Sequence, residues 1–357
     1  MRVLISGGGT GGHLFPAIAV AQALSRSAPD SILLYVGRRG GIEEQAVPRY
    51  GLPLETIVAA KLDMEQLWRN WSFPLIAPRA FWQASRIVSR FRPNVVLGTG
   101  GYVSAPLILA AAIRRIPVVL QEQNLLPGRT TRWLSRVARV VATGYEESAP
   151  YLHARAVVTG TPVRQEFTVR RQEFPSRPRT LLVLGGSQGA HRINQAIASS
   201  VAELTGGLRL TVWHQTGERD LPELQQVRSQ LGPNAGAYLP FGFADDLGDK
   251  IQMADLVLSR AGASAISEVS AVGVPMLLVP GPFAGGHQRL NAEPFARAGA
   301  AVVIPNEMCD GPRVIQEIAA ILDDPARYRT MVDAMRTLGR PRAADEVVSL
   351  LRAAAQP

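Results

Sequence analysis

With 357 residues, 46% of them hydrophobic and 19% charged, the chain is long enough for two domains with separate cores, and its composition excludes a disordered protein. Its single cysteine, Cys309, excludes internal disulfides and a thiolate metal cluster. The formal net charge of +9 favours an anionic partner, such as a phosphorylated substrate or a membrane surface. Because the arginines are spread out, without an aromatic-interleaved block, we expect no nucleic-acid partner.

We expect no membrane-spanning helix, because no apolar run approaches about 18–20 residues. We also expect no signal peptide, because the first apolar strand follows Met1-Arg2 directly. Both expectations, together with the single cysteine, fit a protein of the reducing cytosol.

The first half of the chain alternates strand patterns with helical patterns, which predicts a parallel sheet wrapped by helices. The predicted strands cover residues 2–6, 31–36, 95–98, 117–121, 139–142 and 156–159. The predicted helices cover residues 15–27, 42–50, 79–91, 104–114 and 129–137. A break at Gly160-Thr161-Pro162 and a proline-bearing stretch at 170–179 indicate a domain boundary followed by a linker.

A second strand, glycine turn and helix begin at residues 180, 185 and 192 and repeat the opening of the chain. Further strands are predicted over 208–214, 237–240, 255–258, 275–279 and 300–304. The predicted fold class is α/β, with two Rossmann-like doubly wound domains, residues 1–162 and 163–340, that face each other across a cleft. We expect a last helix, about residues 341–357, to pack back on the first domain.

The turn Gly7-Gly8-Gly9-Thr10-Gly11-Gly12-His13 connects the first strand to the first helix. Five glycines bury no side chain and cost conformational entropy, so they indicate a close approach of the backbone to a ligand. The helix N-terminus favours an anionic or strongly polar ligand. The same dipole disfavours the imidazolium form of His13, which makes a neutral imidazole there the candidate general base.

Two similar glycine turns follow strands at residues 98–104 and 185–190. Taken alone, each could be an ordinary tight turn between a strand and a helix. Together with the first turn they supply more main-chain donors than one pyrophosphate needs, which favours two phosphorylated substrates.

The stretch 259–268 places small residues at a helix N-terminus, where a diphosphate would fit. Glu268 could accept both hydroxyls of a ribose, although a glutamate that stabilises the helix dipole is the alternative. Gln288 and Asn124 carry amides that suit sugar hydroxyls, although each could be a turn or cap residue. No His/Cys cluster has metal spacing, so a leaving diphosphate would need helix ends and an arginine, for which Arg164 is the candidate.

A nicotinamide cofactor is the alternative ligand for the first turn. Gly7-x-Gly9-x-x-Gly12 matches the dinucleotide fingerprint, and Arg38 at the end of the second strand could bind the extra phosphate of NADP. An NADP-dependent oxidoreductase therefore stays open, as does a basic binding protein without turnover.

Taken together, the motifs resemble those of the MurG family of peptidoglycan N-acetylglucosaminyltransferases. The likeness covers nearly the whole chain and rests on residues 8–13, 99–102, 185–190, 259–263 and Gln288-x-x-Asn291, in this order. It implies a GT-B fold that needs no cofactor or metal. It also implies an inverting transfer of GlcNAc from UDP-GlcNAc to the C4 hydroxyl of MurNAc-pentapeptide on undecaprenyl diphosphate, which converts lipid I to lipid II.

The resemblance also implies roles for individual residues. The donor UDP-GlcNAc would contact Thr10, Gly11, Gly12, Asn124, Arg164, Ser187, Ala244, Ala263, Ser264, Ala265, Ile266, Ser267, Glu268 and Gln288. The diphosphate of the acceptor would contact Gly100, Gly101, Tyr102 and Ser104, near the candidate base His13. The family often has a threonine where this chain has Ala265, so a hydroxyl contact to the donor would pass to Ser264 or Ser267.

The stretch 66–82 holds three of the five tryptophans, punctuated by arginines. Tryptophan and arginine favour the headgroup zone of a membrane, although an ordinary core helix is the alternative. Since the implied acceptor is lipid-linked, we expect peripheral docking on anionic lipids at the cytoplasmic face of the inner membrane.

Overall fold

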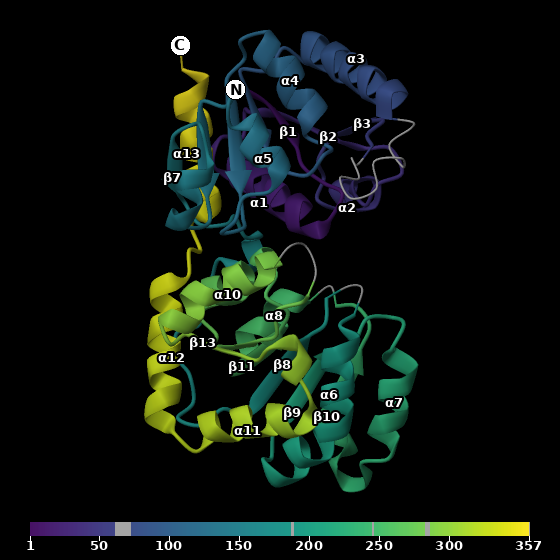
Figure 1. Ribbon diagram of the computed structural model, residues 1–357, viewed down its shortest axis with the longest axis vertical. Coiled ribbons are helices and arrows are strands. Elements are labelled where there is room, and N and C mark those ends of the chain that lie inside the picture. The colour runs from purple at the N-terminus through teal and green to yellow at the C-terminus, as the bar shows by residue number, and fades with distance from the viewer. Residues whose placement is uncertain (61–72, 187–188, 245, 283–285, 357) are drawn as a thin grey trace. The chain divides into compact units, whose positions relative to one another are not determined.

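The computed structural model describes residues 1–357 except 61–72, 187–188, 245, 283–285 and 357 (Figure 1). The chain forms two compact units, Met1–Gln165 with Arg342–Pro357, and Glu166–Pro341. The sequence placed the boundary between residues 162 and 163, whereas the structure keeps Arg164 in the first unit. The reason is packing, because the Arg164 guanidinium lies 4.5 Å from the Phe15 ring and donates a hydrogen bond to Tyr50.

The first unit contains a seven-stranded parallel sheet in the order β3-β2-β1-β4-β5-β6-β7. Its strands are β1 (Arg2–Ser6), β2 (Ile32–Arg38), β3 (Leu54–Ile57), β4 (Val95–Gly98), β5 (Val118–Glu122), β6 (Val140–Thr143) and β7 (Ala156–Val158). The continuous apolar runs suit strands that are covered on both faces. β3 was not predicted, because its sequence Leu54-Glu55-Thr56-Ile57 has two polar residues at its centre and is not an apolar run.

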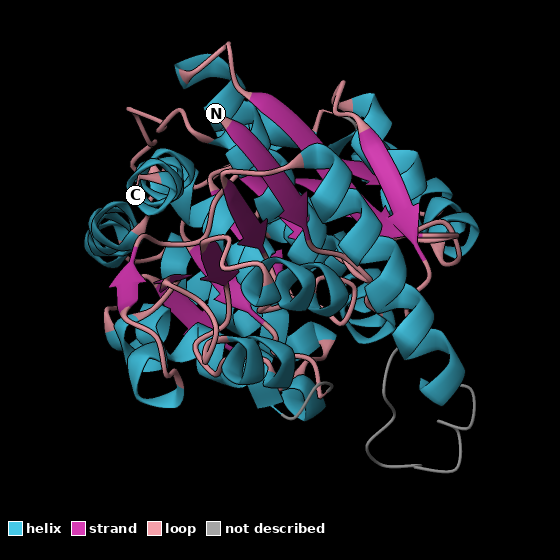
Figure 2. Cartoon of the chain, turned by 90° about the horizontal axis from the view of Figure 1, so that it is seen from above, coloured by secondary structure: helices cyan, strands magenta, loops and turns pink. Residues whose placement is uncertain are grey.

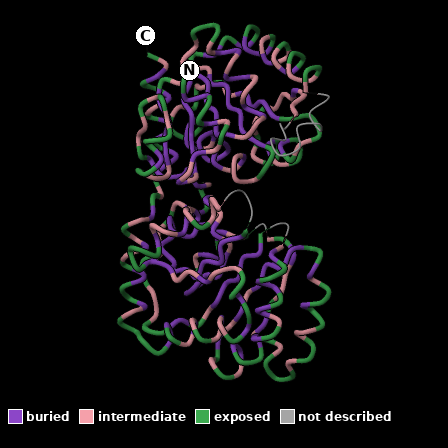
Figure 3. Tube along the Cα trace, in the orientation of Figure 1, coloured by how far each residue is buried: buried purple, intermediate pink, exposed green. Residues whose placement is uncertain are grey.

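Helices cover both faces of this sheet, as Figure 2 shows. They are α1 (Gly11–Ser27), α2 (Glu43–Arg49), α3 (Phe73–Phe91), α4 (Ala105–Ile113), α5 (Arg129–Leu134) and α13 (Ala343–Ala355). On one face α1 and α13 share a core that includes Ile18 and Leu351, and on the other face α3 and α4 share a core that includes Ile87 and Leu107. In Figure 3 these buried residues run along the strands and the inner sides of the helices.

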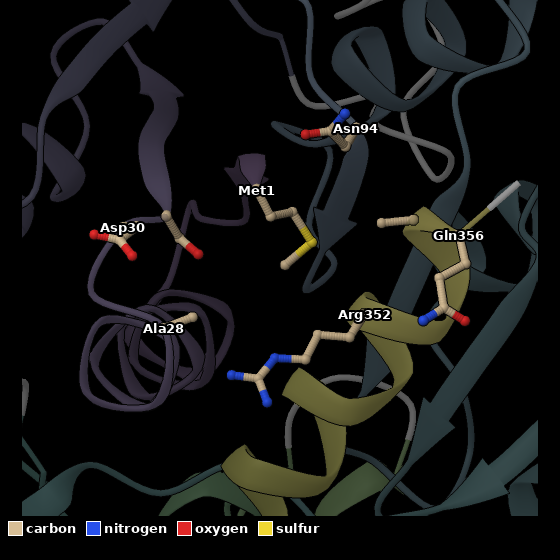
Figure 4. Close-up of a pocket in the computed structure, with 8 residues that line it drawn as sticks. Met1, Ala28, Asp30, Asn94, Arg352 and Gln356 are labelled. Atoms are coloured by element: carbon tan, nitrogen blue, oxygen red, sulfur yellow. The ribbon is translucent and has the colours of Figure 1, made fainter.

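The amino-terminal ends of the strands carry a cavity of about 430 Å³ between the ends of α1 and α13. Met1, Asp30 and Asn94 line it, and Arg352 reaches from α13 to donate a hydrogen bond of 2.8 Å to the Ser27 carbonyl (Figure 4). This cavity lies at the amino-terminal ends of the strands. The glycine turns lie at the carboxyl-terminal ends, where such sheets bind ligands.

The second unit contains a six-stranded parallel sheet in the order β10-β9-β8-β11-β12-β13. Its strands are β8 (Thr180–Leu184), β9 (Thr211–Gln215), β10 (Tyr238–Phe241), β11 (Leu256–Ser259), β12 (Met276–Leu278) and β13 (Ala301–Val303). Its helices are α6 (His191–Ala202), α7 (Leu221–Ser229), α8 (Leu247–Met253), α9 (Ala263–Val272), α10 (His287–Arg297), α11 (Gly311–Leu322) and α12 (Pro325–Leu338). The predicted α/β class with two doubly wound parallel sheets is therefore confirmed.

The stretch 170–179, predicted to be a linker, packs on the second unit. Arg171 forms an ion pair of 2.8 Å with the buried Asp255, and the Phe174 ring packs edge-on against Tyr328 at 6.4 Å. Prolines 175 and 178 exclude regular structure here, but apolar and ionic contacts still fix the segment.

Both sheets reverse their strand order beside the first strand of the unit. In the first unit β1 lies between β2 and β4, and in the second unit β8 lies between β9 and β11. Ligands of such sheets bind at the carboxyl ends of the strands at this switch point. The four predicted turns, which follow β1, β4, β8 and β11, therefore occupy the two switch points.

Candidate active site

The two glycine turns of the first unit contact each other at the switch point between β1 and β4. A Cβ added to Gly101 would lie 2.3 Å from the Gly8 carbonyl oxygen, and one added to Gly7 would lie 1.8 Å from the Thr99 hydroxyl. Gly101 also has a φ of +76°, a conformation that other residues rarely adopt. Glycine is therefore required here by close packing of two backbones.

His13 lies where these turns meet. The helix α1 begins at Gly11, four residues before the predicted start, because Thr10 has extended backbone and directly precedes the first turn of the helix. The Thr99 hydroxyl donates a hydrogen bond of 2.6 Å to the His13 carbonyl, and the Thr99 carbonyl oxygen lies 3.1 Å from His13 Nδ1. One residue of the second turn thus holds both the main chain and the ring of His13.

Burial lowers the pKa of His13 below its ordinary value of 6.5, against the opposing effects of the Glu122 carboxylate and the Thr99 carbonyl. The imidazole is therefore neutral at neutral pH and can accept a proton. The sequence attributed this neutrality to the helix dipole, whereas desolvation is the largest cause in the structure.

A buried carboxylate supports the first turn from below. Glu43 is fully buried, and its Oε1 accepts a hydrogen bond of 2.6 Å from the Gly9 amide. The Tyr35 hydroxyl donates to the Gly7 carbonyl, and burial together with Glu43 raises the pKa of Tyr35. We did not predict a role for Glu43 or Tyr35. The sequence feature that could have indicated Glu43 is its position two residues after Gly40-Gly41, at the start of the helix α2 that follows β2.

The predicted acceptor-binding residues of the second turn differ in exposure. Tyr102 is half-buried, and its hydroxyl accepts a hydrogen bond of 2.8 Å from Arg38, the residue considered for NADP. Ser104 is fully buried, and its hydroxyl donates to the Gly101 carbonyl at 2.9 Å. The Ser104 side chain therefore stabilises the turn, and its binding of the acceptor stays a prediction.

The end of β5 adds a third polar segment to this edge. Glu122 is buried, and its Oε1 accepts from both the backbone and the side-chain amide of Asn124, at 3.0 and 3.1 Å. Its Oε2 accepts from the Gly128 amide at 3.0 Å. Glu122 thus holds in place Asn124, which is predicted to contact the sugar donor UDP-GlcNAc. The sequence did not indicate this role of Glu122.

In the second unit the glycine turn after β8 is fitted against the end of β9. Gly186 and Gly189 have positive φ values, +75° and +73°, and a Cβ on Gly189 would lie 2.6 Å from the Thr216 carbonyl oxygen. The predicted diphosphate residue Ser187 lies outside the described residues.

The helix α9 follows β11 and begins without a side-chain cap at Gly262. Gly262 has no side chain with which to cap the first amide groups, and Ala263, Ser264 and Ala265 at the start of the helix are small. Glu268 is largely buried on the next turn. The Ile266 side chain is fully buried, so this residue can offer a ligand only its backbone.

Gln288 and Ala244 of the second unit are also predicted to contact the sugar donor UDP-GlcNAc. The Gln288 side-chain oxygen accepts a hydrogen bond of 2.7 Å from the Gly281 amide, which leaves its amide nitrogen to donate. Ala244 lines a cavity of about 430 Å³ together with Phe241, Phe243 and Lys250.

Neither a metal cluster nor a spanning helix occurs in the parts of the chain that the structure describes. Among those residues, no three His, Cys, Asp or Glu side chains come together as metal ligands. None of the helices described there has the length and the apolar run needed to traverse a bilayer.

Two family models match the chain. Residues 3–143 match the glycosyltransferase family 28 N-terminal domain, and residues 180–347 match the glycosyltransferase family 28 C-terminal domain. The two matches correspond to the two units and include all four glycine-rich or small-residue turns.

Relatives of known name match over almost the whole chain. The UDP-N-acetylglucosamine–N-acetylmuramyl-(pentapeptide) pyrophosphoryl-undecaprenol N-acetylglucosamine transferases of Desulforudis audaxviator and Moorella thermoacetica are 40% and 42% identical, each over 98% of both chains. The crystal structure of Acinetobacter baumannii MurG superposes with a TM-score of 0.79 at 28% identity over 99% of both chains. A UDP-GlcNAc 2-epimerase from Neisseria meningitidis shares the fold at 16% identity, with a TM-score of 0.70.

These matches confirm the resemblance and leave the NADP-dependent oxidoreductase without support. The two relatives match over 98% of this chain. The chain belongs to the MurG family of glycosyltransferases.

Proposed function

We propose that the chain transfers GlcNAc from UDP-GlcNAc to the C4 hydroxyl of MurNAc-pentapeptide on undecaprenyl diphosphate, with inversion at the sugar carbon. The observation that carries this proposal is identity of 40–42% over 98% of the length of transferases named for this reaction. The placement of main-chain donors at both switch points supports it independently, because the reaction uses two diphosphate substrates.

In this mechanism His13 removes the proton of the C4 hydroxyl. The hydroxyl oxygen forms the new bond to C1 of GlcNAc, the bond from C1 to the diphosphate oxygen breaks, and its electron pair leaves with UDP. The lowered pKa of His13 keeps the imidazole free to take that proton. The amides of the glycine turns and of α9 would stabilise the charges of both diphosphates.

The donor roles fall mainly on the second unit. We assign the diphosphate and ribose to residues 263–268, with Glu268 on the ribose hydroxyls, the uracil to the backbone of Ala244, and the GlcNAc hydroxyls to Gln288. Ser187 would join them on the diphosphate. Thr10, Gly11, Gly12, Asn124 and Arg164 would contact the donor from the first unit.

The acceptor roles fall on the first unit, where Gly100, Gly101 and Tyr102 lie beside His13. Gly100 has a φ of +95°, and its Cα lies so close to the His13 ring that an added Cβ would be 2.8 Å from Nδ1. A diphosphate bound to this turn would therefore place its sugar near the base.

UDP release tests the proposed reaction directly. Purified chain, UDP-GlcNAc and a soluble lipid I analogue should release UDP only when all three are present, and protein fluorescence should titrate with UDP-GlcNAc and not with NADPH. Titration with NADPH alone, or no UDP release with the acceptor present, would contradict the proposed function.

We further propose that the first unit docks on anionic lipid at the cytoplasmic face of the cell membrane, because a polyprenyl-linked acceptor stays in the bilayer. Residues 66–72 of the predicted docking stretch lie outside the described residues. In the described part, α3 exposes Leu75 and Trp82, at 73% and 57%, together with Arg79 and Arg86. Arg86 lies 4.8 Å from the Trp82 ring, so the aromatic and the charge occupy one surface.

Charge reversal tests this surface. The double variant Arg79→Glu, Arg86→Glu should bind phosphatidylglycerol-containing vesicles at least about tenfold more weakly, since each basic residue near an anionic leaflet contributes about 1 kcal/mol. The control Arg329→Glu, Arg340→Glu makes the same charge change at exposed positions of the second unit. Equal binding of both double variants would remove α3 from the docking surface.

A further inference from the structure

Gln123 is a buried side chain at the end of β5 to which no role has yet been given. It is 3% exposed, and its amide nitrogen position lies within hydrogen-bonding distance of His13 Nδ1. Its other amide atom, Oε1, is buried without a hydrogen-bond partner in the part of the chain that the structure describes. The role of a buried amide beside the candidate base depends on which of its two atoms faces the imidazole.

The Thr99 carbonyl restricts what Gln123 can do. A carbonyl oxygen only accepts, so the 3.1 Å contact between the Thr99 oxygen and His13 Nδ1 requires a proton on Nδ1. An Nδ1 that carries a proton cannot accept from the amide nitrogen of Gln123. Because amide oxygen and nitrogen have nearly the same shape, the consistent assignment turns the amide by 180° and directs Oε1 at Nδ1.

We propose that Gln123 is a positioning residue that, together with the Thr99 carbonyl, holds the proton of neutral His13 on Nδ1. The lone pair then lies on Nε2, which becomes the atom that takes the acceptor proton. The hydrogen bond at one imidazole nitrogen decides which nitrogen remains basic. This inference rests on the proposed function, in which His13 is the base.

A second buried histidine provides an internal reference with the opposite tautomer. His214 Nδ1 lies 2.9 Å from the Tyr238 hydroxyl, and Nε2 lies 3.0 Å from Asn194 Oδ1. The Asn194 amide nitrogen donates to the Thr216 carbonyl and to Asp220, at 2.9 and 2.8 Å, so its oxygen must accept. His214 therefore carries its proton on Nε2, whereas His13 carries its proton on Nδ1.

The charged surroundings of His13 matter for a pH-dependent test. The carboxylate that acts on it is Glu122 from β5, which favours the imidazolium form. The turn after β4 contributes the Thr99 carbonyl and, beside Gly9, the Tyr102 ring. A variant that adds a carboxylate at position 123 would act in the same direction as Glu122.

Nitrogen-15 NMR of the full chain labelled at histidine tests the proposal. His13 signals are assigned by their loss in His13→Gln. In the wild type at pH 8, we expect His13 to show a protonated Nδ1 and a bare Nε2, with His214 showing the reverse. A proton on Nε2 of His13 in the wild type would overturn the proposal, whether or not the protein transfers GlcNAc.

Two variants separate positioning from a merely structural role. Gln123→Leu leaves the Thr99 carbonyl as the remaining acceptor at Nδ1, so it should shift part of the His13 population to the Nε2-protonated tautomer and lower kcat, with KM for UDP-GlcNAc within about twofold of wild type. Gln123→Glu should keep the proton on Nδ1, because an ionised carboxylate only accepts, and should move the acid limb of the kcat profile up by about one pH unit or more.

Gln121→Leu is the matched control, because Gln121 is also buried, lies two residues earlier on the same face of the strand, and has no side-chain hydrogen bond to His13 in the part of the chain that the structure describes. It should leave the His13 tautomer unchanged. Loss of the Nδ1 tautomer in Gln123→Glu, or a tautomer ratio in Gln123→Leu equal to that of the wild type, would overturn the role of Gln123. Failure of UDP release in the wild type would instead overturn the proposed function and leave the NMR result standing.

Discussion

The two units share a strand topology, but their switch points are built differently. In the first unit, side chains lock the turns, since Thr99 holds His13 and Glu43 holds Gly9. In the second unit, α9 follows the glycine N-cap Gly262, and the small residues Ala263, Ser264 and Ala265 lie at its first amides. The comparison suggests that the first unit supplies the titratable group of the proposed reaction and that the second unit supplies main-chain hydrogen-bond donors to the diphosphate of UDP-GlcNAc. Substitutions should then alter kcat in the first unit and donor affinity in the second.

The largest effect is expected from His13→Gln, which removes the base and keeps a polar side chain. Loss of a general base costs typically 10²–10⁴-fold in rate, so kcat for UDP release should fall by about that factor. Calorimetric binding of UDP-GlcNAc should stay within about twofold. In the wild type the acid limb of kcat should lie below pH 6.5, because burial lowers the pKa of His13. An unchanged kcat would place the base elsewhere and break the comparison.

The second unit has a buried histidine that should control stability. Burial lowers the pKa of His214 to about 3, against the raising effect of Asp220. In the unfolded chain His214 binds a proton near pH 6.5, whereas in the folded chain it stays neutral to much lower pH. The free energy of unfolding therefore decreases as the pH falls below about 6.5. At about 1.4 kcal/mol per pH unit, denaturant unfolding of the wild type should lose roughly 3 kcal/mol between pH 6.5 and pH 4.

The matched variant His214→Phe should lose the share of this acid dependence that His214 carries and keep the share of His13, whose pKa burial also lowers. It should be less stable at pH 7 because Asn194 and Tyr238 lose their partner. If the acid dependence is undiminished in His214→Phe, another group is responsible. If it disappears in His13→Gln instead, the contrast between the two histidines is reversed.

Glu268→Ala tests whether the second unit binds UDP-GlcNAc. A lost hydrogen bond to a charged group costs about 1.5–3 kcal/mol, so affinity for UDP-GlcNAc should fall roughly 10- to 100-fold. Glu293→Ala on α10 is the control, because Glu293 is 46% exposed and pairs only weakly with Arg289 at 3.8 Å. Equal donor affinities for the two variants, measured by calorimetry, would remove Glu268 from the ribose.

The smallest effects should come from alanine at the turn glycines. Gly101 and Gly189 both have a positive φ, and a Cβ at these positions would lie 2.3 and 2.6 Å from a carbonyl oxygen. Gly101→Ala and Gly189→Ala should therefore each lower the free energy of unfolding by about 1–3 kcal/mol. Gly40→Ala has a φ of +67° but open space around its Cβ in the described structure, and should cost less. A cost at Gly101 no greater than that at Gly40 would show that close packing of the two turns is unimportant.

Much of the fold could be predicted because buried parallel strands are apolar runs, and glycine turns mark where they end. Such local patterns revealed most strands of both sheets and every turn at the switch points. β3 was missed because polar Glu55 and Thr56 interrupt its apolar residues. The segment 170–179 was mistaken for a linker because its contacts, such as Arg171 with Asp255, are distant in sequence.

The sequence by itself determined where the chain approaches a ligand, because only glycine and small residues permit that approach and they are visible as motifs. It also determined the family, because the order of those motifs is specific. Tertiary structure alone decided which side chains support the site, namely Thr99, Glu43, Glu122 and Gln123. The reason is physical, since hydrogen bonds from the ends of β4 and β5 to His13 join residues 86 and 110 positions apart, and no local pattern encodes such a pairing.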